Sequence, residues 1–437
     1  MDWKQYYKDH VMSADEAVKL VKSGDRVATT HAPGEPKVLT DALCRYADQG
    51  GIENVKIWQG LNLSDAVYAQ EKYADKLIVD SCFVGAGVRK AIDEGRGYYA
   101  PASVSMLERM FQDGNVPLDG VFANVTPPDE NGYVNLGISV DYTSPAIKNC
   151  KYVIAQVNRE MPWIPGMDNT FHVSQFAAFV EADLTPWVID PIDDTDPIST
   201  KIGEHIAELI PDGACLQMGQ GKVPNAILKL LADKKDLGVH TEVFSDNLIP
   251  LIEKGVVTGM RKNIHKGKIV AMFVQGSKEL YKYVDKNDLF FMAPGPYTNN
   301  PCVIAQNDDV CAINSAIEVD LTGQVNCAFQ GMHHYSGMGG QLDFLRGAAF
   351  SKGGKPIICL PSTAKRGTVS RIIPQMLQGT PVTTPRVDIH WVVTEYGAVN
   401  LFGKSTSARA EMLIGIAHPD FRDQLQNEWD AAMRSLR

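Results

Sequence analysis

The sequence predicts an α/β protein of two domains, each built on an open, mostly parallel sheet. Three observations lead to this prediction. A chain of 437 residues is too long for one ordinary hydrophobic core. Short apolar runs alternate with helical segments, as expected for parallel strands joined by helices. Two segments, 18–43 and 207–231, share one order of elements, namely helix, turn glycine, strand, Gly/Pro loop and helix. An internal duplication is the simplest explanation, with chance similarity between two βα units as the alternative.

The first predicted domain covers residues 1–190. Ser13 and Glu16 precede an apolar helical run with the spacing of a capping box, and Gly24 is a fitting end for that helix. A second helix is expected over 38–43. Strands are expected at the apolar runs 26–30, 55–58, 77–84, 120–125 and 152–157. Residues 127–137 carry two prolines and an Asn-Gly pair, which predicts a hairpin.

A change of composition separates the two predicted domains. Residues 185–200 contain three prolines and four aspartates and lose the apolar periodicity, so this stretch is the predicted linker. The second domain, 198–437, then restarts with a helix over 202–209. Its expected strands are 215–218, 239–244, 269–273, 310–321, 357–360 and 391–394, and two amphipathic helices, 408–416 and 421–436, close the chain.

The composition argues against several classes of function. A net charge of -10 opposes a broad nucleic-acid interface, which needs clustered Lys and Arg. The first residues lack the pattern of a signal peptide, and no apolar window approaches the length of a membrane span, so we expect a cytoplasmic protein. The eight cysteines form no C-x-x-C pair, which favours reduced and mostly buried thiols.

The motifs of common cofactor sites are missing. Gly85-Ala86-Gly87 follows a strand, but it lacks a third glycine and the acidic residue of a dinucleotide fingerprint, so NAD is not expected. His333 and His334 are adjacent and have no third ligand at a metal-like spacing, so no zinc site is expected. The chain has neither a P-loop nor a G-x-S-x-G elbow. We therefore expect no cofactor and no metal.

The first candidate site is a strand, loop and helix that precede a second strand. Strand 215–218 runs into the loop Gly219-Gln220-Gly221-Lys222-Val223, and Pro224 then opens a helix. The next strand carries Glu242. In a parallel sheet such a loop and the end of the next strand lie at one edge, where α/β proteins bind ligands. A carboxylate beside backbone N–H groups can act as a nucleophile. A solvated or ion-paired glutamate is the alternative.

The second candidate is the glycine-rich segment 336–344, which contains Gly337, Gly339 and Gly340. So many glycines suit neither a helix nor a strand interior, so the backbone there needs unusual dihedral angles or the close approach of another group. A tight structural turn would explain the pattern equally well. Polar residues nearby in the sequence favour a function: Asn314, His333, His334, Tyr335 and Arg346.

Two further candidates follow strand ends. Lys365 and Arg366 come after an apolar strand and could meet a phosphate or a carboxylate, although a solvated loop is the commoner fate of such residues. The other candidate is residues 394–397 together with 403–405, where a predicted strand again ends in a glycine-containing turn.

With these motifs in place, the chain resembles the class I coenzyme A transferases over nearly its whole length. The similar branch is that of acetyl-CoA hydrolase/transferase-like enzymes, which includes 4-hydroxybutyrate and butyrate:acetate CoA-transferases. Several motifs carry the resemblance in the family's order: residues 127–137, 219–225, 240–242, 336–348, 394–397 and 403–405. No single motif among them would suffice.

The resemblance implies two similar α/β domains with the active site between them. It also implies that Glu242 is the nucleophile, that Gly219, Gln220, Gly221, Lys222 and Val223 form a CoA-binding loop, and that Gly337, Gly339 and Gly340 supply backbone donors beside the thioester. Asn314 and Lys365 look like further CoA contacts. The implied partners are acyl-CoA and short carboxylic acids, and the implied assembly is a homodimer or homotetramer.

This sequence departs from the family pattern at Met161-Pro162-Trp163-Ile164, where relatives usually have an arginine and then a small polar residue after the proline. If that segment touches the acyl group, the acid used here could differ from that of the relatives. Arg159 is the residue that could compensate for the missing arginine.

The implied reaction transfers CoA from acetyl-CoA, or another short acyl-CoA, to a short acid such as 4-hydroxybutyrate or butyrate. It proceeds through an acyl-glutamyl anhydride and a glutamyl-CoA thioester. An acyl-CoA hydrolase on the same scaffold is the nearest alternative, because water could resolve the same intermediate. A non-catalytic acyl-CoA sensor and a nicotinamide oxidoreductase are more distant alternatives.

Overall fold

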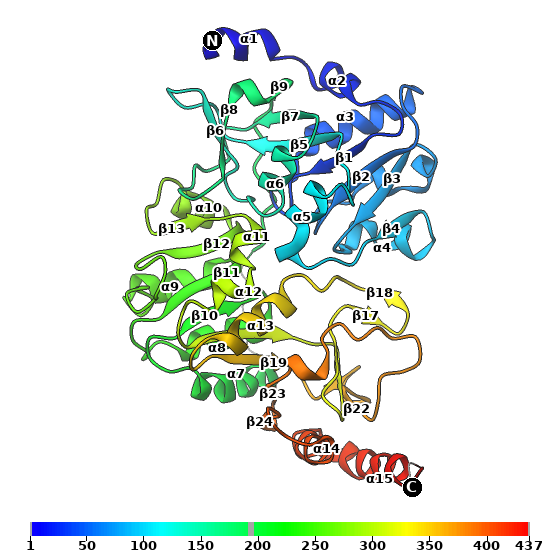
Figure 1. Cartoon of the computed structure of the whole chain (residues 1–437), viewed down its shortest axis with the longest axis vertical. Helices are drawn as coiled ribbons and strands as arrows, with labels where there is room; N and C mark the ends of the chain where they lie inside the picture. Colours follow the sequence, from blue (N-terminus) through cyan, green and yellow to red (C-terminus); the bar gives the residue numbers. More distant parts are fainter. Residues whose placement is uncertain (1, 191–195, 436–437) are drawn as a thin grey trace.

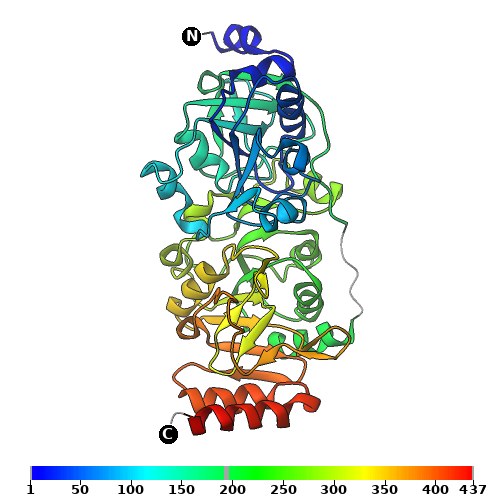
Figure 2. The same cartoon turned by 90° about the vertical axis from the view of Figure 1, so that its right-hand side faces the viewer.

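The computed structural model describes residues 2–190 and 196–435, and it confirms the predicted α/β class with two large sheets. Figure 1 shows the N-terminal sheet, in blue to cyan, above the C-terminal sheet, in green to orange. The two ends of the chain lie at opposite ends of the molecule, with helices α14 (Thr406–Gly415) and α15 (Pro419–Ser435) side by side at the C-terminal end (Figure 2). No helix among the described residues is long and apolar enough to cross a membrane.

The N-terminal sheet has seven parallel strands in the order β4-β3-β2-β1-β5-β7-β9. Their bounds are β1 Arg26–Thr29, β2 Val55–Gln59, β3 Leu77–Ser81, β4 Gly97–Tyr99, β5 Gly120–Val125, β7 Tyr152–Val157 and β9 Ala178–Glu181. The helices of this half are α1 Trp3–His10, α2 Ala14–Ala17, α3 Lys37–Asp48, α4 Ala86–Asp93, α5 Leu107–Gln112 and α6 Thr143–Lys148.

The C-terminal sheet has eight strands in the order β13-β12-β11-β10-β14-β19-β23-β24, and only its last strand is antiparallel. Their bounds are β10 Cys215–Met218, β11 Gly238–Phe244, β12 Ile269–Val274, β13 Phe290–Met292, β14 Val310–Ser315, β19 Lys355–Cys359, β23 Trp391–Thr394 and β24 Gly397–Asn400. Its helices are α7 Pro197–Leu209, α8 Lys222–Leu230, α9 Ile249–Glu253, α10 Lys278–Val284, α11 Gly295–Thr298, α12 Pro301–Ile304 and α13 Gln341–Phe350, followed by α14 and α15.

The two sheets repeat one topology, as the internal similarity of the sequence suggested. In each, the first strand lies inside the sheet, the next three strands follow in turn on one side, and the later strands follow on the other. The first strands, β1 and β10, belong to the two segments whose elements match in order. Each sheet lies within one of the two predicted domains, 1–190 and 198–437.

The two halves pack directly against each other. One hydrophobic cluster contains buried residues of both, such as Trp58 and Met292. The loop after β6 (Tyr133–Asn135) pairs with the C-terminal sheet, since Val140 N–H donates to the carbonyl of Met272. The Gly295 N–H donates in turn to the carbonyl of Asp141. These contacts fix how the N-terminal half meets the edge of the C-terminal sheet.

Several local predictions are confirmed and others are shifted. The Ser13 capping box forms, but the α-helix it caps is short. The run 310–321 divides into β14 and a separate β15 (Glu318–Asp320), and the expected strand at 77–84 ends at Ser81. Helix α8 begins at Lys222, two positions before Pro224. The chain reverses direction within residues 127–137, as expected, and the Thr126 N–H donates a hydrogen bond to the carbonyl of Asn135.

The remaining short strands pair locally or across longer distances. The antiparallel partner of β6 is β8 (Thr170–His172), far along the chain. The others are β16 Val325–Asn326, β17 Phe329–Gln330, β18 His333–His334, β20 Thr363–Ala364, β21 Val369–Ser370 and β22 Ile372–Ile373. In the predicted linker, residues 191–195 lie outside the described residues, and α7 begins at Pro197 with Asp196 as its N-cap. The helix therefore starts inside the stretch that was predicted to be linker.

Candidate active site

The candidate site lies at the carboxyl edge of the C-terminal sheet, where it meets the N-terminal half. Glu242 is close to the end of β11, and Gly219 follows the neighbouring strand β10. Asn314 is close to the end of β14, on the other side of β10. All three residues line one hollow, as expected from parallel strands that end at the same edge.

Two groups hold the carboxylate of Glu242. Asn299 Nδ2 donates a hydrogen bond of 2.7 Å to Glu242 Oε2. Asn299 is fully buried directly after α11, so its amide has no alternative position in water. The backbone N–H of Gly340, at the start of α13, also lies near this carboxylate and favours its charged form, which lowers its pKa. The Glu242 side chain is therefore held at Oε2 by the buried amide of Asn299, and it lies beside the N-terminus of α13.

The glycine-rich segment has the close approach that its composition suggested. A Cβ atom on Gly340 would lie 2.0 Å from Glu242 Oε2 and 2.1 Å from Asn299 Nδ2, so no other residue fits without moving them. Gly339 has φ +54, in the region that favours glycine. A Cβ on Gly337 would lie 2.8 Å from the ring of Phe83 in the N-terminal half. The segment 337–340 thus packs between the Glu242 carboxylate on one side and Phe83 of the N-terminal half on the other.

Burial raises the pKa of Glu242 to about 7, and the nearby carboxyl of Asp343 contributes to the increase, whereas the hydrogen bonds from Asn299 and Gly340 act in the opposite direction. At neutral pH the group is therefore divided between its acid and its carboxylate. Groups with perturbed pKa values in a cleft are typical of functional sites. A carboxylate that is partly desolvated is also a better nucleophile than one in bulk water.

Glu242 and Gly339 lie between two hollows and line both of them. The first, here called the polar hollow, has a volume of about 180 Å³ and is lined by Gln217, Gly219, Asn314, Gly337, Gly340 and Gln341, among others. The second, the apolar hollow, has a volume of about 70 Å³ and is lined mainly by Leu61, Phe83, Val104, Leu107, Met272 and Phe273. A substrate that occupied both would have its reacting atom beside Glu242.

The apolar hollow also contains three polar side chains of the N-terminal half, His31, Asp141 and Tyr142. Burial lowers the pKa of His31 to about 3, so its ring is neutral. Burial raises the pKa of Asp141 to about 7, and its Oδ2 has no hydrogen-bond partner among the described residues. The hollow therefore suits a small uncharged group, with the carboxyl groups of Asp141 and Glu242 in its wall.

The structure brings together five of the residues expected from the sequence around Glu242: Gly219, Asn314, Gly337, Gly339 and Gly340. Gln220 and Gly221 line a neighbouring hollow with Gln275 instead. Val223 is buried in α8 and Lys222 is exposed at its start. Lys365 is exposed at the tip of the β20–β21 hairpin, with φ 48, and lines neither hollow at Glu242.

The other candidates have structural partners away from this site. Arg346 pairs with Asp388, at 3.0 Å, and His334 packs against Tyr99 and Phe329. Glu395 accepts hydrogen bonds from the backbone and hydroxyl of Ser362. No group of three or more His, Cys, Asp or Glu side chains in residues 2–190 and 196–435 is placed to hold a metal ion.

The unusual segment at Trp163 and Ile164 is outside both hollows at Glu242. The Trp163 N–H donates to the carboxylate of Asp285, and Ile164 is buried, with its carbonyl accepting from two asparagines. Arg159 pairs with Asp183 at 3.0 Å. The segment thus joins the two halves, and the structure gives it no contact with the candidate site.

The sequence alone did not identify Asn299, Phe83, His31 or Asp141. Asn299 had the clearest signal, because the stretch Pro294 to Asn300 combines a strand end, a Gly-Pro turn and two amides. Phe83, His31 and Asp141 come from the other half of the chain, so only the packing of the two halves brings them to Glu242. Local spacing contains no information about that contact.

Comparison with known protein families gives matches over both halves of the chain. The model of the acetyl-CoA hydrolase/transferase N-terminal domain matches residues 1–200, and that of the acetyl-CoA hydrolase/transferase C-terminal domain matches residues 276–429. The 4-hydroxybutyrate coenzyme A transferase of Clostridium kluyveri is 41% identical over 430 residues, which are 98% of this chain and 99% of the relative. The butyryl-CoA:acetate CoA-transferase of Anaerostipes caccae is 38% identical over 444 residues, covering 99% and 98% of the two chains.

Solved structures give the same result. The crystal structure of RipA from Yersinia pestis superposes with a TM-score of 0.93 at 38% identity, covering 99% of this chain and 100% of the other. The crystal structure of 4-hydroxybutyrate CoA-transferase from Porphyromonas gingivalis has a TM-score of 0.85 at 36% identity, with the same coverage. The similarity extends over the whole fold and is not confined to one sheet.

Proposed function

This chain belongs to the acetyl-CoA hydrolase/transferase family and is a CoA-transferase, and from this premise we propose that it moves CoA between short acyl-CoAs and short carboxylic acids through Glu242. Acetyl-CoA with 4-hydroxybutyrate or butyrate is the proposed substrate pair, since transferases named for these acids are similar over nearly the whole chain. The observation that carries the proposal is the position of the Glu242 carboxylate between two hollows and against Gly340.

The proposed reaction is a double displacement. The Glu242 carboxylate attacks the thioester carbonyl, the C–S bond breaks, and CoA leaves as a thiolate with an acyl-glutamyl anhydride on the enzyme. The thiolate then attacks the glutamyl carbonyl carbon and releases the first acid as a carboxylate, which leaves a glutamyl-CoA thioester. A second carboxylate attacks this thioester, and the same steps in reverse release the new acyl-CoA. The bond energy of the thioester is kept in covalent intermediates throughout.

Each step passes through a tetrahedral oxyanion, which needs donors fixed before the reaction begins. The amide of Asn299 and the backbone N–H of Gly340 are the donors nearest to Glu242, and they support this role. Losing one such donor typically costs about 3 kcal/mol of transition-state stabilisation. In this proposal, CoA extends through the polar hollow and the acyl group occupies the apolar hollow.

We expect the size of the apolar hollow to limit the acyl chain. Its volume is only about 70 Å³, the smaller of the two hollows at Glu242, and its walls are mainly apolar side chains. In a series of straight-chain acyl-CoAs, kcat/KM should therefore be highest between acetyl and butyryl and fall at least about tenfold by hexanoyl. Leu61→Ala, which enlarges one wall, should recover activity on the longer chains. Equal kcat/KM for butyryl-CoA and octanoyl-CoA in the unmodified protein would contradict this assignment.

The activity should also depend on pH through Glu242. Only the carboxylate attacks, and burial raises the pKa of this group to about 7, so kcat/KM for acyl-CoA should rise with pH up to about 7 and then level off. Asn299→Ala removes a donor that stabilises the carboxylate, so it should move the rise to higher pH. A profile that stays flat through this range in both proteins would show that Glu242 is not the titrating nucleophile.

The dependence on an acceptor acid separates a transferase from a hydrolase on the same scaffold. We expect acetyl-CoA to be consumed rapidly only when a carboxylic acid is present, because in a transferase the bound CoA and the surrounding walls keep water from the glutamyl-CoA thioester. The experiment follows acetyl-CoA by chromatography with and without butyrate, and it reads butyryl-CoA as the product. Release of free CoA at the same rate in both samples would favour the hydrolase.

A further inference from the structure

The N-terminal sheet has its own counterpart of the polar hollow. Asn124 is the fifth residue of β5, as Asn314 is the fifth residue of β14, and each strand lies beside the first strand of its sheet. The loop between β1 and α3 corresponds in the same way to the loop between β10 and α8. This is the position where the strand order of an open α/β sheet reverses and where such sheets bind ligands.

A hollow of about 330 Å³ occupies this position, here called the N-terminal hollow. Its walls include Glu35, Lys37, Asn124, Gln156, Trp187 and Lys278. It shares no lining residue with the polar or the apolar hollow at Glu242. The loop that carries Glu35 also carries His31, which lines the apolar hollow, so this loop lies between the two spaces.

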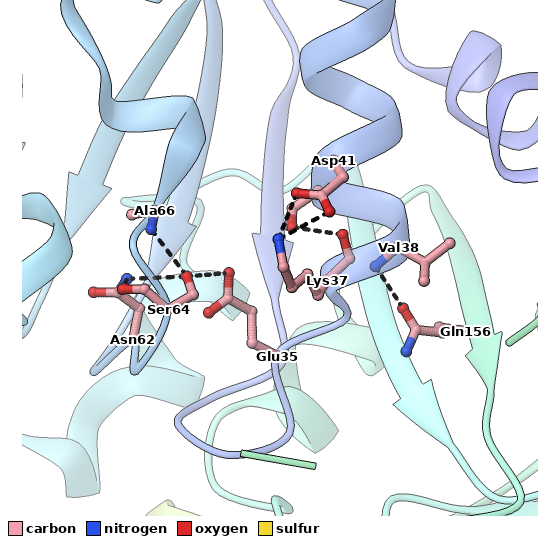
Figure 3. A network of polar contacts seen from close by, with 9 residues as sticks. Glu35, Lys37, Val38, Asp41, Asn62, Ser64, Ala66 and Gln156 are labelled. Atoms are coloured by element: carbon pink, nitrogen blue, oxygen red, sulfur yellow. Dashed lines mark hydrogen bonds and ion pairs between the residues drawn. The ribbon is translucent and has the colours of Figure 1, made fainter. Parts of the chain in front are cut away.

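Two acceptors in this wall are buried without a hydrogen-bond partner. Glu35 is only 5% exposed, and its Oε1 accepts from the hydroxyl of Ser64 at 2.9 Å (Figure 3), whereas its Oε2 has no partner among the described residues. Asn124 is only 2% exposed, and its Oδ1 is likewise unpartnered. An unpaired buried acceptor is costly, and a ligand that donates to it recovers that cost.

The remaining walls supply positive charge and apolar surface. Lys37, at the start of α3, pairs with Asp41 at 2.9 Å (Figure 3), and its side chain is 38% exposed. Lys278 is exposed at the start of α10, on the C-terminal half. Trp187 forms another wall of the hollow, and its backbone N–H donates a hydrogen bond to the carbonyl of Pro33. Amines at the opening, acceptors inside and an aromatic wall together suit an amphipathic anion.

We propose that the N-terminal hollow binds a small hydroxylated anion, whose hydroxyl groups donate to Glu35 and Asn124 and whose acidic group faces Lys37 and Lys278. A sugar phosphate and a hydroxy acid share this chemistry. The site is separate from the transferase reaction, and it does not require Glu242 to be the nucleophile.

The test is calorimetric titration of the full chain with CoA present at saturation, so that the transferase site is occupied. The probes are ribose 5-phosphate and glycerate, which carry both features, with ribose and propyl phosphate as probes that each lack one. We expect ribose 5-phosphate or glycerate to bind with one site per chain and at least about tenfold more tightly than the partial probes. Binding of ribose 5-phosphate would identify the acidic group of the ligand as a phosphate, and binding of glycerate would identify it as a carboxylate.

Three variants decide whether the binding is at this hollow. Glu35→Gln keeps the shape and the bond to Ser64 but replaces an acceptor with a donor, so it should weaken binding at least about tenfold. Lys278→Gln should weaken binding and reduce its salt dependence. Glu71→Gln, at an exposed glutamate that lines neither this hollow nor the one beside it, is the matched control and should bind as the unmodified protein does.

Some results would overturn the proposal. These are the absence of binding by both full probes at saturating CoA, and unchanged affinity in a folded Glu35→Gln variant. Thermal unfolding of each variant verifies that it is folded. Glu242→Ala should leave probe binding unchanged, so a failure of the transferase mechanism and a failure of this second site remain distinguishable.

Discussion

Glu242→Asp is expected to abolish CoA transfer while the fold stays intact. The shorter side chain retracts the carboxylate by one methylene from Asn299 Nδ2, which lies 2.7 Å from Oε2, and from the thioester carbonyl that it must attack. Glu242→Gln keeps the length but removes the nucleophile. Both variants should lose at least ~10⁴-fold in kcat, as expected when a covalent nucleophile is lost or misplaced. Steady-state transfer from acetyl-CoA to butyrate measures the loss.

Glu181→Gln provides the matched control, because Glu181 also ends a parallel strand but is exposed in the N-terminal half. It should retain full activity. Glu242→Gln should be no less stable than the unmodified protein, since burial already raises the pKa of Glu242 to about 7 and the amide avoids burying its charge. Glu242→Asp or Glu242→Gln with more than about a hundredth of normal turnover would exclude the nucleophilic role.

Gly340→Ala is expected to have the second largest effect. The added methyl group would lie 2.0 Å from Glu242 Oε2, so either the carboxylate or the start of α13 must move. Because Gly340 has φ -89, alanine costs no backbone strain there, and the effect is confined to the contact. We expect a loss of about 10²- to 10³-fold in kcat, similar to the loss of one oxyanion donor.

The control for this variant is Gly415→Ala at the end of α14, where an added Cβ meets nothing within 4 Å. It should leave kcat unchanged. Circular dichroism and thermal unfolding should show that Gly340→Ala remains folded. If the folded Gly340→Ala protein has normal kcat, the close contact between this turn and Glu242 has no catalytic importance.

Most of the large sheets could be predicted from the sequence, because their strands are buried on both faces and appear as short apolar runs. β5, β7 and β10 have the expected bounds, and the shared order of elements indicated that the second half repeats the first. The short strands between Glu318 and Ile373 could not be predicted. Most of them are only two or three residues long and pair with a near neighbour, as β17 does with β18 and β20 does with β21. Strands this short show no clear periodicity, and the pairing of β15 with β22, far along the chain, depends on tertiary contacts and not on local spacing.

The site was predictable only where its parts belong to one sheet. Glu242 and Gly219 could be placed at one edge from the order strand, loop, helix and strand, and Gly340 from a glycine pattern that indicated close approach. Asn314 was expected only from its polarity and from the resemblance, because the predicted strand 310–321 extended beyond it. Lys365 follows a strand in the same way, yet it lies exposed on a hairpin away from Glu242. Phe83 and Asp141 reach the site from the other half, which requires knowing how the halves pack.

The most direct test of the central claim is to trap the thioester on Glu242. The enzyme is incubated with acetyl-CoA alone, reduced with borohydride and digested, and the peptide that contains Glu242 is examined by mass spectrometry. We expect the glutamyl-CoA thioester to be reduced to an alcohol, which lowers the mass of that peptide by about 14 Da, and we expect no change in the Glu242→Gln protein. An unmodified Glu242 peptide from enzyme that transfers CoA normally, or a reduced carboxyl at another position, would contradict the account.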